Sequence, residues 1–172
     1  MNIITNLFKA AIGLFIFAIS ALFLWAIVAS LFDGDDSTQT TQSIQTQNTE
    51  QAYTDFMVRH SGQVADTLTN ISELMMNPTP EDENWVTKTV TSLITLEELA
   101  KEAIGFSPVP EKYSEMHNTY LKAMEEFEYV AQNLPTAIDN QDDALINELA
   151  SRIMKANEQM SEATKMAKEL IR

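Results

Sequence analysis

The chain has 172 residues, enough for one domain or two small ones, and its 11 basic and 25 acidic residues give a formal net charge of −14. This balance excludes a general nucleic-acid-binding protein, which needs a basic face to neutralise phosphates. The lack of cysteine excludes a disulfide scaffold and a thiolate metal site, and four glycines are too few for the many turns of an all-β fold.

The first predicted element is a membrane-spanning helix at residues 10–32, a run of 23 residues without a charge. A helix needs roughly 20 apolar residues to cross a bilayer, so this segment is long enough. Lys9 precedes it and the next basic residue is Arg59, which predicts that residues 1–9 are cytoplasmic and the rest of the chain lies outside the plasma membrane. Trp25 and Phe32 are expected to anchor the span at its interfaces, together with Lys9.

A cleaved signal peptide is the alternative for the same segment, because Val28, Ala29 and Ser30 form an acceptable small-residue cleavage site. The apolar stretch is, however, longer than the roughly 7–15 residues of a signal-peptide core. The sequence therefore favours an uncleaved anchor.

A flexible polar tether is predicted at residues 33–50, where Ile44 is the one aliphatic side chain. Such a segment buries too little apolar surface to offset the entropy lost on ordering. We expect it to hold the following domain near the membrane without becoming part of that domain.

Amphipathic helices are predicted throughout residues 51–172, because apolar residues recur there every three or four positions. Four helices are expected, at about residues 51–77, 80–105, 110–134 and 141–172, with Thr79 and Asn140 as N-caps and a break or kink at Pro135. Short connections favour an antiparallel up-down four-helix bundle, so the fold class is all-α. The alternative is a three-helix bundle on which the first segment docks loosely. The stripe expected to face the core from the second helix consists of Val86, Val90, Leu93, Leu96, Ala100 and Ile104.

His60 and His117 are the candidate site residues. Each lies on the apolar stripe of its helix, and in an up-down bundle they fall at similar depth, with Glu97 predicted at about the same level. Two imidazoles and a carboxylate are a donor set for a divalent metal ion or a proton-sensitive cluster. The alternative is that both histidines are half-solvated boundary residues or are hydrogen-bonded to tyrosine hydroxyls.

No feature of the sequence indicates an enzyme or an organic cofactor. It has no cysteine nucleophile, no G-x-S-x-G motif and no Gly-rich phosphate loop. The pattern favours an interaction module or accessory subunit that binds a protein partner, or a second copy of the chain, through a helix face. The alternative function is a sensor or binder of a small ligand or divalent metal centred on His60 and His117.

Residues 109–170 also resemble small extracytoplasmic helical proteins of Gram-positive bacteria, many of them lipoproteins. The residues that carry this resemblance are Val109-Pro110, Tyr113, His117, Tyr120-Leu121, Leu134-Pro135 and Ala137-Ile138-Asp139-Asn140. The resemblance implies a cell-surface location and transfers no catalytic residue. The lipidated cysteine of those proteins is absent here, and the predicted membrane helix stands in its place.

Overall fold

A computed structural model of the chain describes residues 41–170, and within them the prediction of an all-α protein is confirmed. There are four long helices, α3 (Thr41–Met76), α4 (Glu83–Gly105), α5 (Ser114–Asp139) and α6 (Asp143–Glu169), and the short 3₁₀ helix η2 (Glu111–Tyr113) before α5. No helix in this part of the chain is long and apolar enough to span a bilayer. The predicted span at residues 10–32, with Lys9, Trp25 and Phe32, lies outside the described residues.

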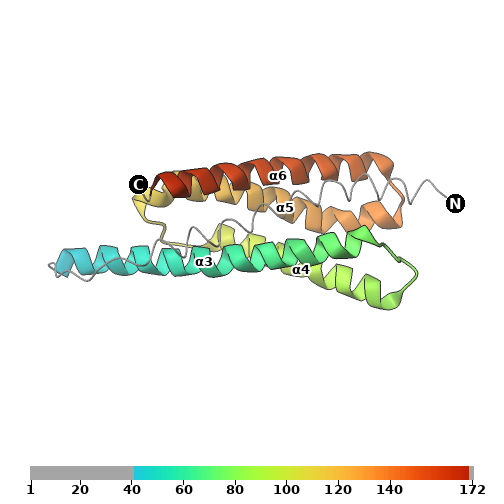
Figure 1. The fold of residues 1–172 in the computed structure, drawn as a ribbon, viewed down its shortest axis with the longest axis horizontal. Coiled ribbons are helices and arrows are strands. Elements are labelled where there is room, and N and C mark those ends of the chain that lie inside the picture. The colour runs from blue at the N-terminus through green and yellow to red at the C-terminus, as the bar shows by residue number, and fades with distance from the viewer. Residues whose placement is uncertain (1–40, 171–172) are drawn as a thin grey trace.

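The four helices form a bundle in which successive helices run in opposite directions (Figure 1). Helix α4 packs against α3 and α5, and α5 packs against α6. The α3–α4 and α5–α6 connections lie at one end of the bundle, and the α4–α5 connection lies at the other. The first segment does not dock loosely, since Val64 and Ile71 of α3 are fully buried. The three-helix alternative is therefore wrong.

Helix α3 begins at least ten residues before the expected boundary, because residues 41–50 are helical where the sequence predicted the end of the flexible tether. Two contacts fix the junction with the packed part of α3. Glu50 forms an ion pair with Lys112 of η2, and its carbonyl accepts a 2.8 Å hydrogen bond from the Thr54 hydroxyl. No Pro or Gly interrupts residues 41–61, so once Tyr53 is packed the helix can extend backwards one hydrogen bond per residue.

The predicted helix ends are wrong at three positions, each for a local reason. Asp82, not Thr79, caps α4 by accepting from the Asn84 N–H at 2.9 Å, and Asp142, not Asn140, caps α6 through the Leu145 N–H at 3.0 Å. Pro135 does not end α5, which continues to Asp139. Only one turn follows this proline, and Ala137 in that turn is fully buried, so packing holds the turn in place.

The predicted spacing of core residues, every three or four positions, is confirmed in α3, α5 and α6, whereas the predicted core stripe of α4 is half wrong. Leu93, Leu96 and Ala100 are buried, but Val86 and Val90 are 39% and 41% exposed, and Ile104 is exposed as well. Their places are taken by the residues one position earlier in the chain, Trp85, Thr89 and Ala103. The Trp85 indole N–H donates to the Leu74 carbonyl at 2.9 Å, so a large side chain and a hydrogen bond decide the rotation of α4.

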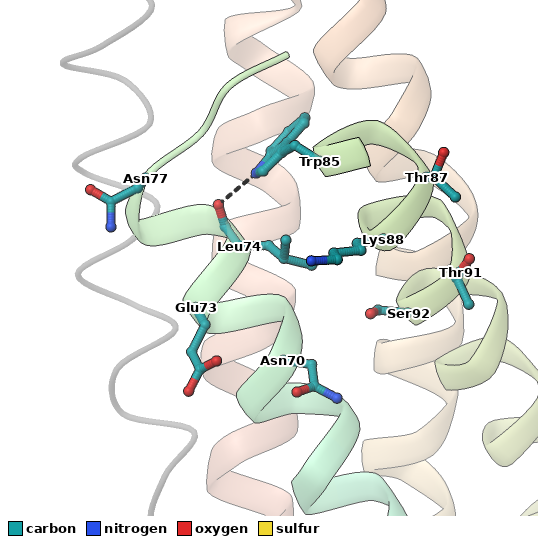
Figure 2. A pocket seen from close by; sticks show the side chains of 9 residues that line it. All are labelled: Asn70, Glu73, Leu74, Asn77, Trp85, Thr87, Lys88, Thr91 and Ser92. Carbon is teal, nitrogen blue, oxygen red and sulfur yellow. Dashed lines mark hydrogen bonds between the residues drawn. The ribbon is translucent and has the colours of Figure 1, made fainter. Parts of the chain in front are cut away.

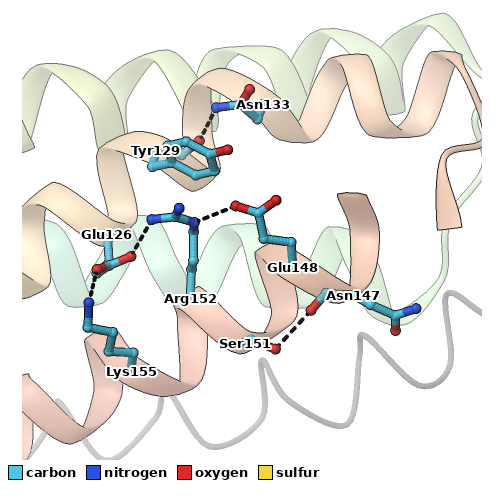
Figure 3. A network of polar contacts seen from close by, with 8 residues as sticks. All are labelled: Glu126, Tyr129, Asn133, Asn147, Glu148, Ser151, Arg152 and Lys155. Carbon is cyan, nitrogen blue, oxygen red and sulfur yellow. Dashed lines mark hydrogen bonds and ion pairs between the residues drawn. The ribbon is translucent and has the colours of Figure 1, made fainter. Parts of the chain in front are cut away.

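A polar network ties α5 to α6 near the middle of the bundle (Figure 3). Glu126 is 8% exposed, and its carboxylate accepts from Arg152 at 2.9 Å and from Lys155 at 2.6 Å. Burial alone would raise the pKa of Glu126, but these two hydrogen bonds outweigh it and hold the pKa below its ordinary value. The Arg152 guanidinium also lies over the Tyr129 ring, 3.6 Å from its centroid, and pairs with Glu148.

Candidate functional site

Two tyrosine–histidine pairs join α3 to α5 inside the bundle. The Tyr120 hydroxyl lies 2.7 Å from His60 Nδ1, and the Tyr53 hydroxyl lies 3.3 Å from His117 Nδ1. His60 is 0% and His117 is 4% exposed, so they are not half-solvated boundary residues. The part of that alternative which proposed hydrogen bonds to tyrosine hydroxyls is confirmed.

The hydrogen bonds of His60 determine which ring nitrogen carries the proton. His60 Nε2 lies 2.7 Å from the Leu99 carbonyl oxygen, which can only accept, so Nε2 is the donor. In the neutral ring Nδ1 is then an acceptor, and the Tyr120 hydroxyl donates to it. A single imidazole thus connects α3 to α4 through Leu99 and to α5 through Tyr120.

Stacked aromatic rings cover this cluster on the side of the α4–α5 connection. Phe106, from that connection, stacks on Phe56 with centroids 3.9 Å apart, and Phe56 stacks on His60 at 5.0 Å. Tyr53 and Tyr113 stack at 5.0 Å. The roles of Phe56 and Phe106 were not predicted from the sequence, although an aromatic residue four positions before His60 was a usable signal.

The environment of the cluster favours the neutral form of both histidines. Burial lowers the pKa of His60, and the Leu99 hydrogen bond and the Glu102 carboxylate oppose this only in part, while Arg59 reinforces it. Glu102 is itself engaged by Arg59, with 2.6 Å between Oε1 and the guanidinium nitrogen. The pKa of His117 is lowered by burial first and by the proximity of His60 second. Burial also raises the pKa of Tyr53 and Tyr120, which keeps both hydroxyls protonated.

Glu97 does not join the two histidines, contrary to the prediction. Its carboxylate pairs with Lys101 at 2.5 Å and accepts from Gln132 of α5 at 3.1 Å. Gln132 follows His117 by fifteen residues along α5, which is about 22 Å of helix. Leu99, two residues after Glu97, contacts His60 through its backbone carbonyl, whereas the Glu97 side chain lies on another side of α4, where it meets Lys101 and Gln132.

Across residues 41–170 no three His, Cys, Asp or Glu side chains gather into a group that could hold a metal ion. Both nitrogens of His60 are already used in hydrogen bonds. The cluster therefore offers a metal no third ligand among these residues and no free nitrogen on His60. Its chemistry is that of a buried hydrogen-bond network whose histidines can take up protons.

A second feature is an open groove of about 560 Å³ at the other end of the bundle, between the end of α3 and the start of α4 (Figure 2). Leu74 and Trp85 lie at its base, where the indole hydrogen bond ties the two helices together. The other lining residues are polar or charged and mostly solvent-exposed: Asn70, Glu73, Asn77, Thr87, Lys88, Thr91 and Ser92.

The third feature is the exposed face of α4 that the core leaves uncovered. Val86, Val90 and Ile94 are 39%, 41% and 51% exposed, and their spacing of four residues puts them on one side of the helix. We call these three residues the apolar ridge. Single exposed apolar residues are common, but three aligned β-branched side chains make a continuous apolar surface.

No protein-family model matches the chain, and no curated protein or solved structure is significantly similar to it.

Proposed function

We propose that the protein is an interaction module, an accessory subunit that binds another protein through the apolar ridge of α4. The observation that carries this proposal is the alignment of Val86, Val90 and Ile94 on the solvent side of a helix whose opposite side is packed into the bundle. A partner helix that lays its own apolar face on this ridge would remove three half-exposed β-branched side chains from water.

The position of this module in the cell is part of the proposal. Residues 10–32 would anchor the chain in the plasma membrane with Lys9 on the cytoplasmic side, and the helical bundle would lie outside. The resemblance of residues 109–170 to extracytoplasmic proteins supports the same location. The bundle needs no catalytic residue or cofactor for this role.

The test is site-specific photo-cross-linking of the full chain in membranes of cells that express it. A benzophenone amino acid at position 90 should capture a partner, whereas the same probe at Asn118, an exposed position on α5, should not. Val90→Asp should abolish capture from a probe at position 94, because it places a charge in the contact. Thr91→Asp is the matched control, since it adds the same charge to an exposed residue beside the ridge. Equal capture in both variants would refute the ridge as the binding surface.

A second candidate function is an acid sensor centred on His60 and His117. It is favoured by one observation, the burial of two neutral imidazoles in hydrogen bonds that link three helices. Protonation would put a positive charge in the core and weaken those links. A melting temperature that stays constant between pH 8 and 5.5 would exclude the acid sensor. A melting temperature that does not change when zinc, copper or nickel is added would exclude a metal-binding function of the same two histidines.

A further inference from the structure

We propose that the partner of the apolar ridge is an amphipathic helix of another protein that carries a basic cluster at one end, and that this cluster lies over the Val86 end of the ridge. This inference rests on the proposed function, since it names the chemistry of the partner that the ridge would bind. The charges that surround the two ends of the ridge favour such a partner.

The Val86 end of the ridge is strongly acidic. Glu83 precedes Val86 by three residues and so lies on the same face of α4. Glu81 and Asp82 directly precede Glu83 in the chain. The α3–α4 and α5–α6 connections lie at the same end of the bundle (Figure 1). Three more exposed carboxylates lie at or beside the α5–α6 connection: Asp139, Asp142 and Asp143.

Few basic side chains compensate these carboxylates. Lys88 is the only basic residue within residues 77–93, and residues 135–151 contain none. Lys88 lines the groove beside α3 and so lies on a different side of α4 from the ridge. A cationic group brought to the Val86 end would therefore meet a negative potential that the protein itself leaves unneutralised.

The Ile94 end of the ridge is less acidic, because Glu98, four residues after Ile94, is its one exposed carboxylate outside an ion pair, against Glu81, Asp82 and Glu83 at the Val86 end. Glu97 follows Ile94 by three residues on the same face, but it is paired with Lys101. A basic cluster on the partner gains less at this end than at the Val86 end. The difference between the two ends gives the bound helix a preferred direction, since only one orientation brings its charges to the acidic end.

A second copy that met this ridge with its own ridge would not supply the complement. Of the two lysines of α4, Lys88 lies on the groove side of the helix and Lys101 is engaged by Glu97. Two molecules of net charge −14 also repel one another at low salt. The central part of the ridge carries no charge, so it does not require a charge of either sign in the middle of the partner helix. The partner that fits has an apolar centre and a lysine- or arginine-rich end.

The experiment uses the full chain in native membranes with the photo-reactive amino acid at position 94, and compares two charge-reversal variants. Glu81→Lys/Glu83→Lys reverses the acidic end, and Glu111→Lys/Glu115→Lys makes the same change in net charge at the opposite end of the bundle. Both change exposed acidic residues at the start of a helix, and Asp82, which caps α4, is kept. Circular dichroism and thermal melting of each purified variant establish that it is folded.

We expect the Glu81→Lys/Glu83→Lys variant to lower the cross-linking yield about tenfold at 50 mM salt and by much less at 500 mM salt, because screening removes the long-range attraction. The Glu111→Lys/Glu115→Lys variant should keep the yield of the unmodified chain. The cross-linked partner peptide, identified by mass spectrometry, should be apolar and adjoin a segment rich in lysine or arginine.

Three other outcomes would overturn the inference in different ways. If Val90→Asp abolishes capture but both charge reversals leave it unchanged, the ridge is the binding surface and the basic-ended partner is wrong. If the captured peptide belongs to this chain itself, a second copy occupies the ridge. If Val90→Asp has no effect, the proposed function itself fails.

Discussion

The hydrogen bond between His60 and Tyr120 can be tested by a double-mutant cycle that replaces His60 with leucine and Tyr120 with phenylalanine. Both side chains are buried, His60 at 0% and Tyr120 at 1% exposure, and their 2.7 Å hydrogen bond connects α3 to α5. Each single substitution removes one partner and leaves the other as a buried polar group that water cannot reach.

The expected size follows from what each variant leaves unpaired. His60→Leu leaves the Tyr120 hydroxyl without an acceptor, and Tyr120→Phe leaves His60 Nδ1 without a donor, at a cost of about 1–3 kcal/mol each. In the double variant neither orphan exists. The Leu99 carbonyl loses its bond to Nε2 in both variants that lack His60, so that loss cancels from the coupling energy. The double variant should therefore be about 1–2 kcal/mol more stable than the sum of the single effects predicts.

The assay is urea unfolding of the purified chain at pH 7.5, followed by circular dichroism at 222 nm. The control cycle combines His60→Leu with Tyr129→Phe, which removes the same hydroxyl from a tyrosine that packs under Arg152 elsewhere on α5. These two changes should add to within about 0.5 kcal/mol because the residues share no partner. Strict additivity in the His60–Tyr120 cycle would show that this hydrogen bond does not hold α3 to α5.

Two further predictions concern charge. Between pH 7.5 and 5 the free energy of unfolding should fall by up to about 1.4 kcal/mol per pH unit for each of His60 and His117. Burial lowers their pKa in the folded state, so the unfolded chain, with an ordinary histidine pKa near 6.5, binds these protons first as the pH falls. His60→Leu should remove about half of this slope, and an unchanged slope would locate the titration elsewhere. Glu126→Gln should cost about 1–3 kcal/mol in urea unfolding, because Arg152 and Lys155 lose a largely buried carboxylate, and an effect as small as that of Glu162→Gln in an exposed pair would contradict this.

Helix number and the inward faces of α3, α5 and α6 could be predicted from the sequence because they depend on local periodicity. In α5, for example, residues from His117 to Leu134 repeat by threes and fours with polar residues between them, and the structure buries this stripe. Helix α4 was ambiguous because two neighbouring faces have apolar residues at helical spacing. One contains Val86 and Val90, and the other contains Trp85 and Leu93. Periodicity alone does not choose between such faces.

Only part of the histidine site could be predicted. The burial of His60 and His117 follows from their positions on apolar stripes. The partners of these histidines do not, because Tyr120 is separated from His60 by sixty residues and Leu99 contributes a backbone carbonyl that any residue possesses. The wrong partners predicted for Glu97 have the same origin, since the rotation of α4 about its axis is set by its packing against α3 and α5.

For residues 41–170 the sequence by itself thus determined the helical class, the four helical segments and the inward-facing stripe of three of them, because these follow from the local spacing of apolar residues. It left open whether the first segment packs into the bundle. It also determined the acidic balance that constrains any partner. Tertiary structure decided the rotation of α4, and with it the exposure of the apolar ridge, because one buried Trp85 and its hydrogen bond outweigh the burial of two valines. It also decided the pairing of His60 with Tyr120, which exists only once α3, α4 and α5 have packed together.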